Sequence, residues 1–372
     1  MTLDSLYTTL ERWFARKTAN SGVRRTSDSQ IALASDIGLV REENQDRVGA
    51  MRFRDSDASS VVLVALADGM GGMRDGGQCA AMVLARFFAD FASSTGKDYE
   101  SRLLAAVLAA NRTVHERFSG GGGATLSAIL ATQSGKIFAV NVGDSRIYRF
   151  GWRLLQQLTT DDTLAGQLNR KSEGIGSNEL LQFVGIGREI EPHVFETEND
   201  FGTTGFLLTS DGVHFLPKES MEAVMSHAPE PPIGMKRLVD LAKWSGGHDN
   251  ASAALVLAPP APISDLADDA YLAVEVWDPF GDVQCVIFAK QPPKVVVENS
   301  RIVPPTPKVE KVATKKSRAP RKQKNKTSPA MRQEKDSGAM GGTGTPSAEV
   351  KGEDKPNAPQ LIIDFPNKSS GR

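Results

Sequence analysis

The chain has 372 residues, of which 40% are hydrophobic and 24% are charged, so it can build a substantial folded core. Its net charge of −1 argues against a surface that binds nucleic acid or acidic substrates in general. The two cysteines, Cys79 and Cys285, form no metal-binding or disulfide pattern, which favours a reducing, cytoplasmic location. We expect no signal peptide and no transmembrane segment, because no apolar run has the required length and flanks.

The N-terminal segment has apolar residues at helical spacing, which predicts an amphipathic helix over residues 1–17, then a polar linker to residue 29. Docking of this helix on its own domain is the favoured interpretation, and membrane or partner binding is the alternative. A strand is expected at residues 31–39. The apolar run from Val61 to Ala67 is predicted to be a buried strand, and it ends at Asp68.

Two packed helices follow, at residues 77–93 and 99–118. From residue 124 the pattern changes to alternating strands separated by glycine turns, which is typical of an antiparallel meander rather than of βαβ units. The remaining expected elements are strands at residues 124–132, 136–142, 145–150, 153–158, 206–209 and 251–258, and helices at residues 161–168, 218–227 and 233–244. A proline-rich segment at residues 259–262 marks the end of a main domain that spans residues 30–258.

The C-terminal part divides into two predicted regions. Strand-like residues 271–277 and 283–289 predict a β-hairpin within an appended segment, residues 259–299. Residues 300–372 are rich in Pro, Lys, Ser and Gly and are predicted to be a disordered tail. The tail contains a basic block at residues 308–326. A solvated linker and an electrostatic tether for an acidic partner, nucleic acid or an anionic surface are the two interpretations of this block.

Three acidic motifs share one design, in which an Asp followed by Gly or Asn stands at the edge of an apolar strand: Asp68-Gly69, Asp211-Gly212 and Asp249-Asn250. Such a strand holds the carboxylate rigidly, and hard divalent cations prefer oxygen ligands. Carboxylates gathered in one cleft would repel one another without a cation between them. Asp46 and Asp144 bring the supply of acidic groups to what a two-metal centre uses.

No other pattern in the sequence points as clearly to a chemistry. The five histidines show no metal-binding spacing, and no serine lies in a nucleophile-elbow context. Arg41 lies just before Asp46 in the sequence, and its guanidinium fork would suit a phosphate. A surface salt bridge is the alternative role for this arginine.

Taken in chain order, the motifs resemble those of the metal-dependent protein phosphatases of type 2C, and they are most similar to the bacterial branch of that family. The resemblance extends from about residue 30 to residue 258. The motifs that carry it are Arg41-Glu42-Glu43-Asn44-Gln45-Asp46, Ala67-Asp68-Gly69-Met70-Gly71-Gly72, Gly123-Ala124-Thr125, Val142-Gly143-Asp144-Ser145-Arg146, Leu158-Thr159-Thr160-Asp161-Asp162, Thr209-Ser210-Asp211-Gly212 and Asp249-Asn250. The resemblance implies an α+β fold with a central sandwich of two antiparallel β-sheets, flanked by helices on both faces.

The resemblance also implies a centre of two Mn²⁺ or Mg²⁺ ions, with a third ion in some bacterial members. Asp68 would bridge the two ions, and the carbonyl group of Gly69 would bind the second. Asp211 and Asp249 would hold the first ion.

Further roles around these ions follow from the same resemblance. Asp46 would support the second ion, directly or through water, and Asp144 would recruit the third ion together with Asp211. Arg41 would clamp the phosphate, and Asn250 would orient its neighbouring aspartate or the metal-bound waters. The implied reaction is hydrolysis of phosphoserine or phosphothreonine esters by a metal-activated water, without a phosphoenzyme.

The implied partners are phosphorylated proteins, the substrates of a cognate Ser/Thr kinase. Two alternatives stay open, namely a phosphatase-like binding or scaffold module and a hydrolase of small phosphate esters. The chain also departs from the family pattern. Gln45 replaces a Glu that many relatives use as a ligand, Met70 stands where animal relatives carry a histidine proposed as general acid, and Phe183-Val184-Gly185 lacks the usual arginine.

Overall fold

The computed structural model describes residues 2–26, 30–55, 60–70, 75–95, 98–152, 154–167, 179–187, 189–197, 202–257 and 271–288. All of them belong to a unit formed by Met1–Val296, and Val297–Arg372 form a second unit. The predicted disordered tail and the proline-rich segment at residues 259–262 lie outside the described residues. The division of the chain into domains at residues 29, 258 and 299 stays a prediction.

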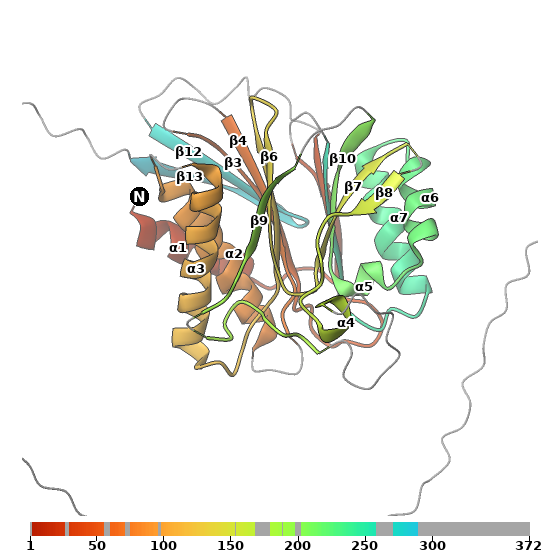
Figure 1. Cartoon of the computed structure of the whole chain (residues 1–372), viewed down its shortest axis with the longest axis horizontal. Coiled ribbons are helices and arrows are strands. Elements are labelled where there is room, and N and C mark those ends of the chain that lie inside the picture. The colour runs from red at the N-terminus through yellow and green to blue at the C-terminus, as the bar shows by residue number, and fades with distance from the viewer. Residues whose placement is uncertain are drawn as a thin grey trace, which may run out of the picture. The chain divides into compact units, whose positions relative to one another are not determined.

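The described residues form two antiparallel β-sheets that face each other, with helices on both outer faces (Figure 1). The first sheet contains, in spatial order, β1 (Ser21–Arg25), β2 (Ile31–Asp36), β11 (Ala251–Leu257), β10 (Thr203–Thr209), β7 (Arg146–Gly151) and β8 (Leu154–Gln157). The second sheet contains β13 (Gly281–Phe288), β12 (Tyr271–Asp278), β3 (Arg47–Arg54), β4 (Ser60–Ala67), β5 (Leu126–Thr132), β6 (Ile137–Val142) and β9 (His193–Thr197). This arrangement confirms the predicted α+β sandwich.

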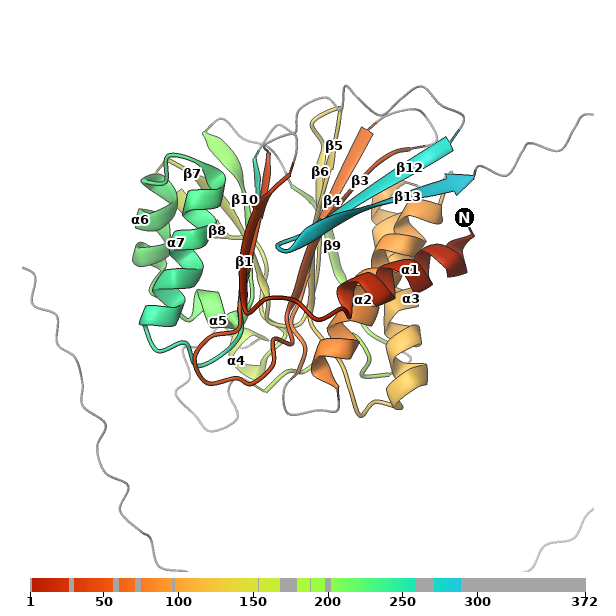
Figure 2. The same cartoon turned by 180° about the vertical axis from the view of Figure 1, so that it is seen from behind.

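Each sheet has its own layer of helices (Figures 1 and 2). The second sheet is covered by α1 (Leu3–Phe14), α2 (Gly76–Ser93) and α3 (Tyr99–Phe118), and the first by α5 (Asp211–His214), α6 (Lys218–Ser226) and α7 (Pro231–Trp244). The short helix α4 (Leu164–Gln167) lies at one end of the sandwich. One hydrophobic core fills the space between the sheets, and two others lie under the helix layers. All 8 residues of β4 are buried, because a central strand covered on both faces has no polar side.

The structure corrects several expectations and adds two strands that no sequence pattern predicted, β3 and β9. The strand expected at residues 31–39 ends at Asp36. The expected polar linker contains β1, an edge strand with no fully buried residue, which therefore leaves no apolar pattern in the sequence. The sequence pattern does not reveal β3, because Arg52 interrupts its apolar run and is ion-paired with Glu275 of β12. The meander is wrong at one connection, since β6 and β7 belong to different sheets. The chain crosses from the second sheet to the first through Gly143 and Asp144.

The predicted hairpin is present as β12 and β13, joined through Pro279 and Phe280. Trp277 of β12 pairs with Ala50 of β3, so the hairpin extends the second sheet. Helix α1 buries its apolar face against α2 beside this hairpin, as expected of a helix that docks on its own domain (Figure 2). None of the helices in the described part of the chain combines the length and apolar character that crossing a membrane requires.

Candidate metal and phosphate site

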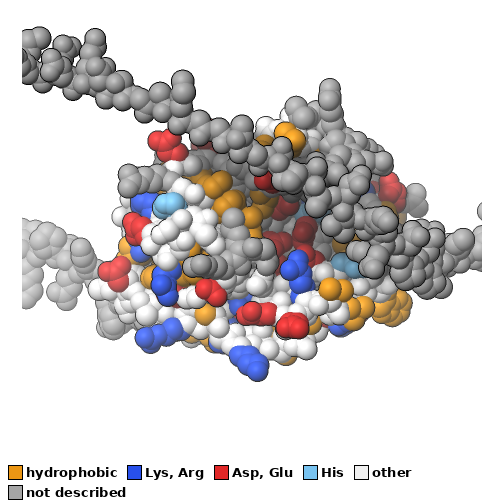
Figure 3. Space-filling model, turned by 90° about the horizontal axis from the view of Figure 1, so that it is seen from below, with side chains coloured by type: hydrophobic (Ala, Val, Ile, Leu, Met, Phe, Trp, Pro, Cys, Tyr) orange, Lys and Arg blue, Asp and Glu red, His pale blue; other side chains and the backbone are white. Residues whose placement is uncertain are grey.

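Five aspartates from separate segments meet at one end of the sandwich, the lower end in Figure 1. Asp68 directly follows β4, Asp144 lies between β6 and β7, and Asp211 begins α5. Asp46 directly precedes β3, and Asp249 lies two residues before β11. Figure 3 is a view onto this end and shows acidic side chains at its centre. The antiparallel sandwich therefore brings all five predicted acidic residues into one cluster.

Asp68 and Asp211 influence each other directly within this cluster, because each is among the groups that shift the pKa of the other. Burial, followed by the charges of Asp46, Asp211, Asp144 and Asp249, raises the pKa of Asp68 well above its usual range. Burial and the charge of Asp249 also raise the pKa of Asp211. Because each group disfavours ionisation of the others, the cluster retains protons when no cation is present.

Asp46 is the most buried member of the cluster, with 4% of its surface exposed. Burial and then the charge of Asp211 raise its pKa to about 7, although Ser210 Oγ donates a hydrogen bond of 2.8 Å to Asp46 Oδ2. Ser252 N donates to Ser210 Oγ at 2.9 Å, and Ser252 Oγ lies 2.9 Å from Ser35 Oγ. Ser210 stands in the motif Thr209-Ser210-Asp211-Gly212 without a predicted role of its own, and Ser35 and Ser252 lie within buried strands that carry no motif, so the sequence did not indicate that these serines support Asp46.

Asp144 is directed by the turn between β6 and β7. Gly143 has a φ angle of +100°, which glycine adopts easily, and its N–H donates a hydrogen bond of 2.8 Å to Oδ2 of buried Asp162. Burial, followed by the charges of Asp211 and Asp161, raises the pKa of Asp144 to about 7. Asp162 thus fixes the turn while Asp144 shares the electrostatic environment of the cluster.

Gly69 directly follows Asp68 and occupies a position that admits no side chain. A β-carbon there would lie 2.3 Å from the carbonyl oxygen of Gly76 and 2.7 Å from that of Gln45. Only glycine allows this close approach of the start of α2 and the loop before β3. Gly69 therefore packs three backbone segments together beside the carboxylates.

Arg41 lies at the rim of the cluster, with its side chain 40% exposed. Its Nη2 donates a hydrogen bond of 2.7 Å to Oδ2 of Asp249. This hydrogen bond is the main cause that raises the pKa of Arg41, and the charges of Asp211 and Asp68 act in the same direction. The arginine is therefore charged and faces the cluster. It forms a salt bridge and also lies where a phosphate clamp is expected, so the two roles considered for Arg41 do not exclude each other.

Asn250 holds the loop that leads from β2 to β3, and 4% of its surface is exposed. Its amide group makes three hydrogen bonds with the loop backbone, donating to Ile37 O at 2.9 Å and Glu43 O at 3.1 Å and accepting from Gln45 N at 2.8 Å. The backbone N–H of Asn250 donates to Asp249 Oδ1 at 2.8 Å. The side chain of Asn250 is thus engaged by the loop, and its backbone orients the neighbouring aspartate.

The donor set suits a divalent cation, although the arrangement around an ion is not preformed. No three His, Cys, Asp or Glu side chains within the described ranges are placed closely enough to hold a metal ion as they stand. The cluster nevertheless offers carboxylate oxygens, which are hard ligands. Burial and then the neighbouring carboxylates raise the pKa values of Asp46 and Asp68, and a bound cation would offset both effects. Binding would replace shared protons by a cation and draw the carboxylates together.

Two facing antiparallel sheets, with an acidic cluster and an arginine at one end, match the class of metal-dependent phosphatases that the motifs resemble. The family model described as protein phosphatase 2C matches residues 40–240, which is more than half of the chain. The chain belongs to the protein phosphatase 2C family.

Two relatives illustrate the extent of the similarity. The chain is 31% identical over 235 residues to the serine/threonine protein phosphatase PstP of Mycobacterium tuberculosis, across 60% of this chain and 44% of that protein. It is 30% identical over 241 residues to the serine/threonine phosphatase stp of Listeria monocytogenes, across 60% of this chain and 93% of that protein. The match therefore spans less than half of the mycobacterial relative and nearly all of the listerial one.

Solved structures show the same similarity. The catalytic domain of PstP in complex with 2 manganese ions is 31% identical with a TM-score of 0.50, across 64% of this chain and 99% of that chain. The phosphatase MsPP of Mycobacterium smegmatis, in complex with cacodylate, is 32% identical with a TM-score of 0.51, across 61% of this chain and 97% of that chain. A bacterial serine phosphatase at 21% identity, with a TM-score of 0.56 across 63% of this chain and 99% of that chain, supports the fold alone.

Proposed function

We propose that residues 30–258 act as a metal-dependent protein serine/threonine phosphatase that hydrolyses phosphoserine and phosphothreonine esters. The observation that carries this proposal is the convergence of five aspartates from separate segments beside Arg41. Membership of the 2C family supports it, as does the similarity to a PstP structure that holds 2 manganese ions.

The proposed ligands fall into two groups. Two Mn²⁺ or Mg²⁺ ions would be held by four carboxylates and one backbone carbonyl, from Asp46, Asp68, Asp211, Asp249 and Gly69. A third ion would take Asp144 together with Asp211. When bound, the ions supply Lewis acidity that generates a hydroxide-like nucleophile from water and offsets charge on the phosphoryl group.

The residues around the ligands bind and orient the substrate. Arg41 would hold phosphate oxygens, because a guanidinium has five N–H donors and uses one of them on Asp249. The pair with Asp249 keeps the guanidinium over the cluster. Ser210 holds the carboxylate of Asp46 and Asn250 holds the loop before it, so that Asp46 is in place before the substrate binds.

Two alternative functions would use the same residues differently. A binding module gains nothing from carboxylates that raise one another's pKa, so the cluster argues against it. A hydrolase of small phosphate esters would share the same centre.

The test compares kcat/KM for a phosphothreonine peptide, a nucleotide and p-nitrophenyl phosphate, each with Mn²⁺ and with chelator. We expect the peptide to have the highest kcat/KM, whereas a preference for the nucleotide, or no turnover at all, would contradict the proposal.

The finer biological setting is also a proposal. We propose phosphorylated proteins as substrates, a cognate Ser/Thr kinase as the opposing activity, and the cytoplasm as the location, in keeping with two cysteines that are buried and form no disulfide. For the basic block at residues 308–326 we propose an electrostatic tether. Deletion of residues 300–372 should weaken binding to a phosphoprotein substrate in a pull-down and leave hydrolysis of a short phosphopeptide unchanged. Loss of the peptide activity would contradict this division of roles.

A further inference from the structure

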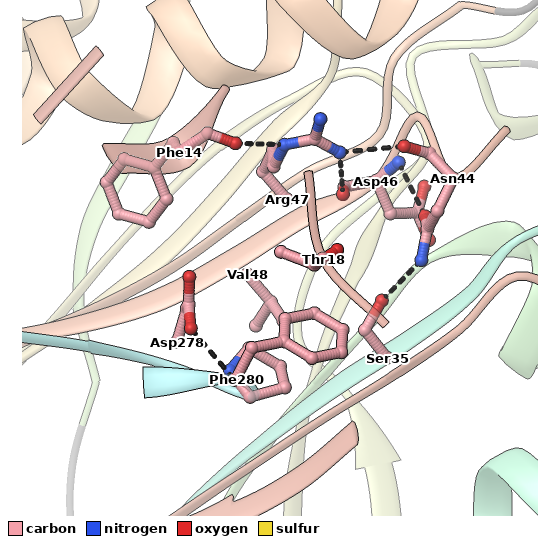
Figure 4. Close-up of a pocket in the computed structure, with 10 residues that line it drawn as sticks. Phe14, Thr18, Ser35, Asn44, Asp46, Arg47, Val48, Asp278 and Phe280 are labelled. Carbon is pink, nitrogen blue, oxygen red and sulfur yellow. Dashed lines mark hydrogen bonds between the residues drawn. The ribbon is translucent and has the colours of Figure 1, made fainter. Parts of the chain in front are cut away.

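Arg47 joins the loop that carries Asp46 to the end of helix α1 (Figure 4). Its Nε donates a hydrogen bond of 2.6 Å to the carbonyl oxygen of Phe14. Its Nη1 donates to the carbonyl oxygens of Asn44 at 2.8 Å and Asp46 at 2.7 Å. One guanidinium therefore links the last turn of α1 to the backbone of a proposed metal ligand.

The same end of α1 is attached to the β12–β13 hairpin. Arg16 donates from Nη1 and Nη2 to the two carboxylate oxygens of Asp278, at 2.5 and 2.8 Å, and from Nη1 to Trp13 O at 2.7 Å. Asp278 Oδ1 also accepts a hydrogen bond of 2.8 Å from Phe280 N in the hairpin turn. Because the last carbonyl groups of a helix lack helical donors and favour nearby cations, Arg16 and Arg47 both stabilise this end of α1.

Two aromatic rings close the space between these segments. A β-carbon at Gly49 of β3 would lie 2.9 Å from the ring of Phe14, whose centroid is 5.9 Å from that of Phe88 in α2. A β-carbon at Gly22 of β1 would lie 2.6 Å from the ring of Phe280. Helix α1, strand β1 and the β12–β13 hairpin are thus fitted closely to one another and to β3, and we call these three elements the brace.

The brace lies entirely outside residues 40–240, the part of the chain that the family model matches. It nevertheless reaches the acidic cluster at Asp46, whose backbone is linked to the brace through Arg47. One small pocket is lined by Phe14, Asp278 and Phe280 of the brace and by Ser35 and Asp46 of the site (Figure 4). The position of Asp46 is therefore connected to elements that the family match does not include.

We propose that Arg47 is a positioning residue, which holds the backbone at Asp46 against the brace and so sets the affinity of the acidic site for divalent cations. The proposal rests on the phosphatase function proposed above. A ligand that its neighbours hold in place loses less conformational freedom when the cation binds, which strengthens binding. Arg47 makes no use of the Asp46 carboxylate in this role: it holds the carbonyl groups of Asn44 and Asp46 on one side and the carbonyl group of Phe14 in the brace on the other.

The test measures Mn²⁺ binding to chelator-treated full-length protein by electron paramagnetic resonance of the unbound ion, so it requires no turnover. Arg47→Met should raise the Kd for Mn²⁺ about 10-fold or more, the effect typical of losing a residue that supports a metal ligand. Arg47→Lys should recover part of the affinity, because a single ammonium group cannot reach all three carbonyl oxygens. Arg16→Met breaks the ion pair with Asp278 and should raise the Kd by a smaller factor. The double variant should show less than the product of the two effects, because both residues act through α1.

Arg52 provides the matched control. It lies on the same strand as Arg47 and is ion-paired with Glu275 of the same hairpin, further along β3 from Asp46. Arg52→Met should lower the Tm and leave the Kd for Mn²⁺ unchanged.

Several outcomes decide the proposal. A folded Arg47→Met variant with the wild-type Kd overturns it, and so does an equal loss of affinity in Arg52→Met, because that result would reflect general loosening. If Arg47→Met does not fold, the Kd for Mn²⁺ of Arg47→Lys and of Arg16→Met is compared with the wild-type Kd instead, and wild-type values in both folded variants overturn the proposal. If the Kd for Mn²⁺ changes as expected but the protein cleaves no phosphopeptide, the positioning role of Arg47 is supported and the phosphatase function is contradicted. A wild-type protein that binds no Mn²⁺ overturns both.

Discussion

Arg41 Nη2 lies 2.7 Å from Asp249 Oδ2, although the two residues are 208 positions apart in the chain. The pair joins the proposed phosphate-binding group to a proposed cation ligand. A phosphate that enters the cluster would therefore meet a cationic group already held in place by the acidic residues.

Arg41→Ala should lower kcat/KM for a phosphothreonine peptide about 100-fold, which corresponds to roughly 2.7 kcal/mol of transition-state stabilisation. Arg41→Lys should recover only a small part, because an ammonium group cannot reproduce the forked contact with phosphate. The affinity for Mn²⁺ should not weaken, since Asp249 is released from its ion pair. Steady-state kinetics across an Mn²⁺ titration check both expectations, and wild-type kcat/KM in Arg41→Ala would exclude the clamp.

Asp68→Asn removes one charge from the centre of a repelling cluster, where burial and four neighbouring aspartates raise the pKa of Asp68. At pH 8 the metal-free variant should therefore be more stable than the wild type. A gain of about 1 kcal/mol would raise the Tm by roughly 2–4 °C in a domain of this size. Hydrolysis and the increase of Tm on addition of Mn²⁺ should both be lost.

The measurement is thermal unfolding with chelator and with Mn²⁺. Asp240→Asn is the matched control, because Asp240 pairs with Lys236 on the exposed side of α7. This variant should keep the wild-type activity and the wild-type response to Mn²⁺. A lower Tm of metal-free Asp68→Asn would show that the cluster is not under repulsion.

The stability of the metal-free protein should depend on pH through Asp46 and Asp144. Burial and neighbouring charges raise the pKa of each to about 7, whereas the unfolded value is near 3.9. The folded state then binds more protons between these two values. The stability that these groups contribute is complete below about pH 4 and is lost as the pH rises through about 7.

Urea unfolding with chelator should therefore give a free energy of unfolding that falls between about pH 4 and pH 7. Saturating Mn²⁺ should reduce this fall, because the cation replaces the protons. The fall should also be smaller in Asp46→Asn, which cannot ionise at that position. An equal fall in wild type and Asp46→Asn would contradict the assignment.

Three members of the site could be predicted because each is an aspartate at the edge of an apolar strand. Asp68, Asp211 and Asp249 each stand beside Gly or Asn at the edge of a buried strand, and strands of a sandwich end together, so a shared acidic cleft follows from the sequence. The partner of Arg41 could not be predicted, because a contact across 208 positions depends on the path of the whole chain.

The support behind Asp46 leaves even less trace in the sequence. Ser210 and Ser252 acquire their role from the pairing of neighbouring segments at β10 and β11. Arg47 contacts carbonyl groups, which every residue possesses, so residue type gives no indication of those contacts. Likewise β1 is an exposed edge strand, whose residues show no alternation to distinguish it from a linker.

Asn250→Ala removes the three hydrogen bonds that hold the loop before β3. The carbonyl groups of Ile37 and Glu43 would lose a donor and the N–H group of Gln45 would lose an acceptor, so the free energy of unfolding should fall by about 1–3 kcal/mol. The Kd for Mn²⁺ should rise as well, because Asp46 ends the same loop. Asn250→Asp keeps the size of the side chain and loses its donors, and should show the same two effects. Urea unfolding and Mn²⁺ binding test this pair, and no change in either variant would remove Asn250 from the positioning of the loop.

The central claim is that the clustered aspartates hold divalent cations that enable phosphoester hydrolysis. The most direct measurement is phosphate release from a phosphothreonine peptide by chelator-treated protein to which Mn²⁺ is returned in steps. We predict no release before Mn²⁺ is added, full recovery as the site fills, and no recovery in Asp211→Asn. Equal rates in chelator and in Mn²⁺ would contradict the account.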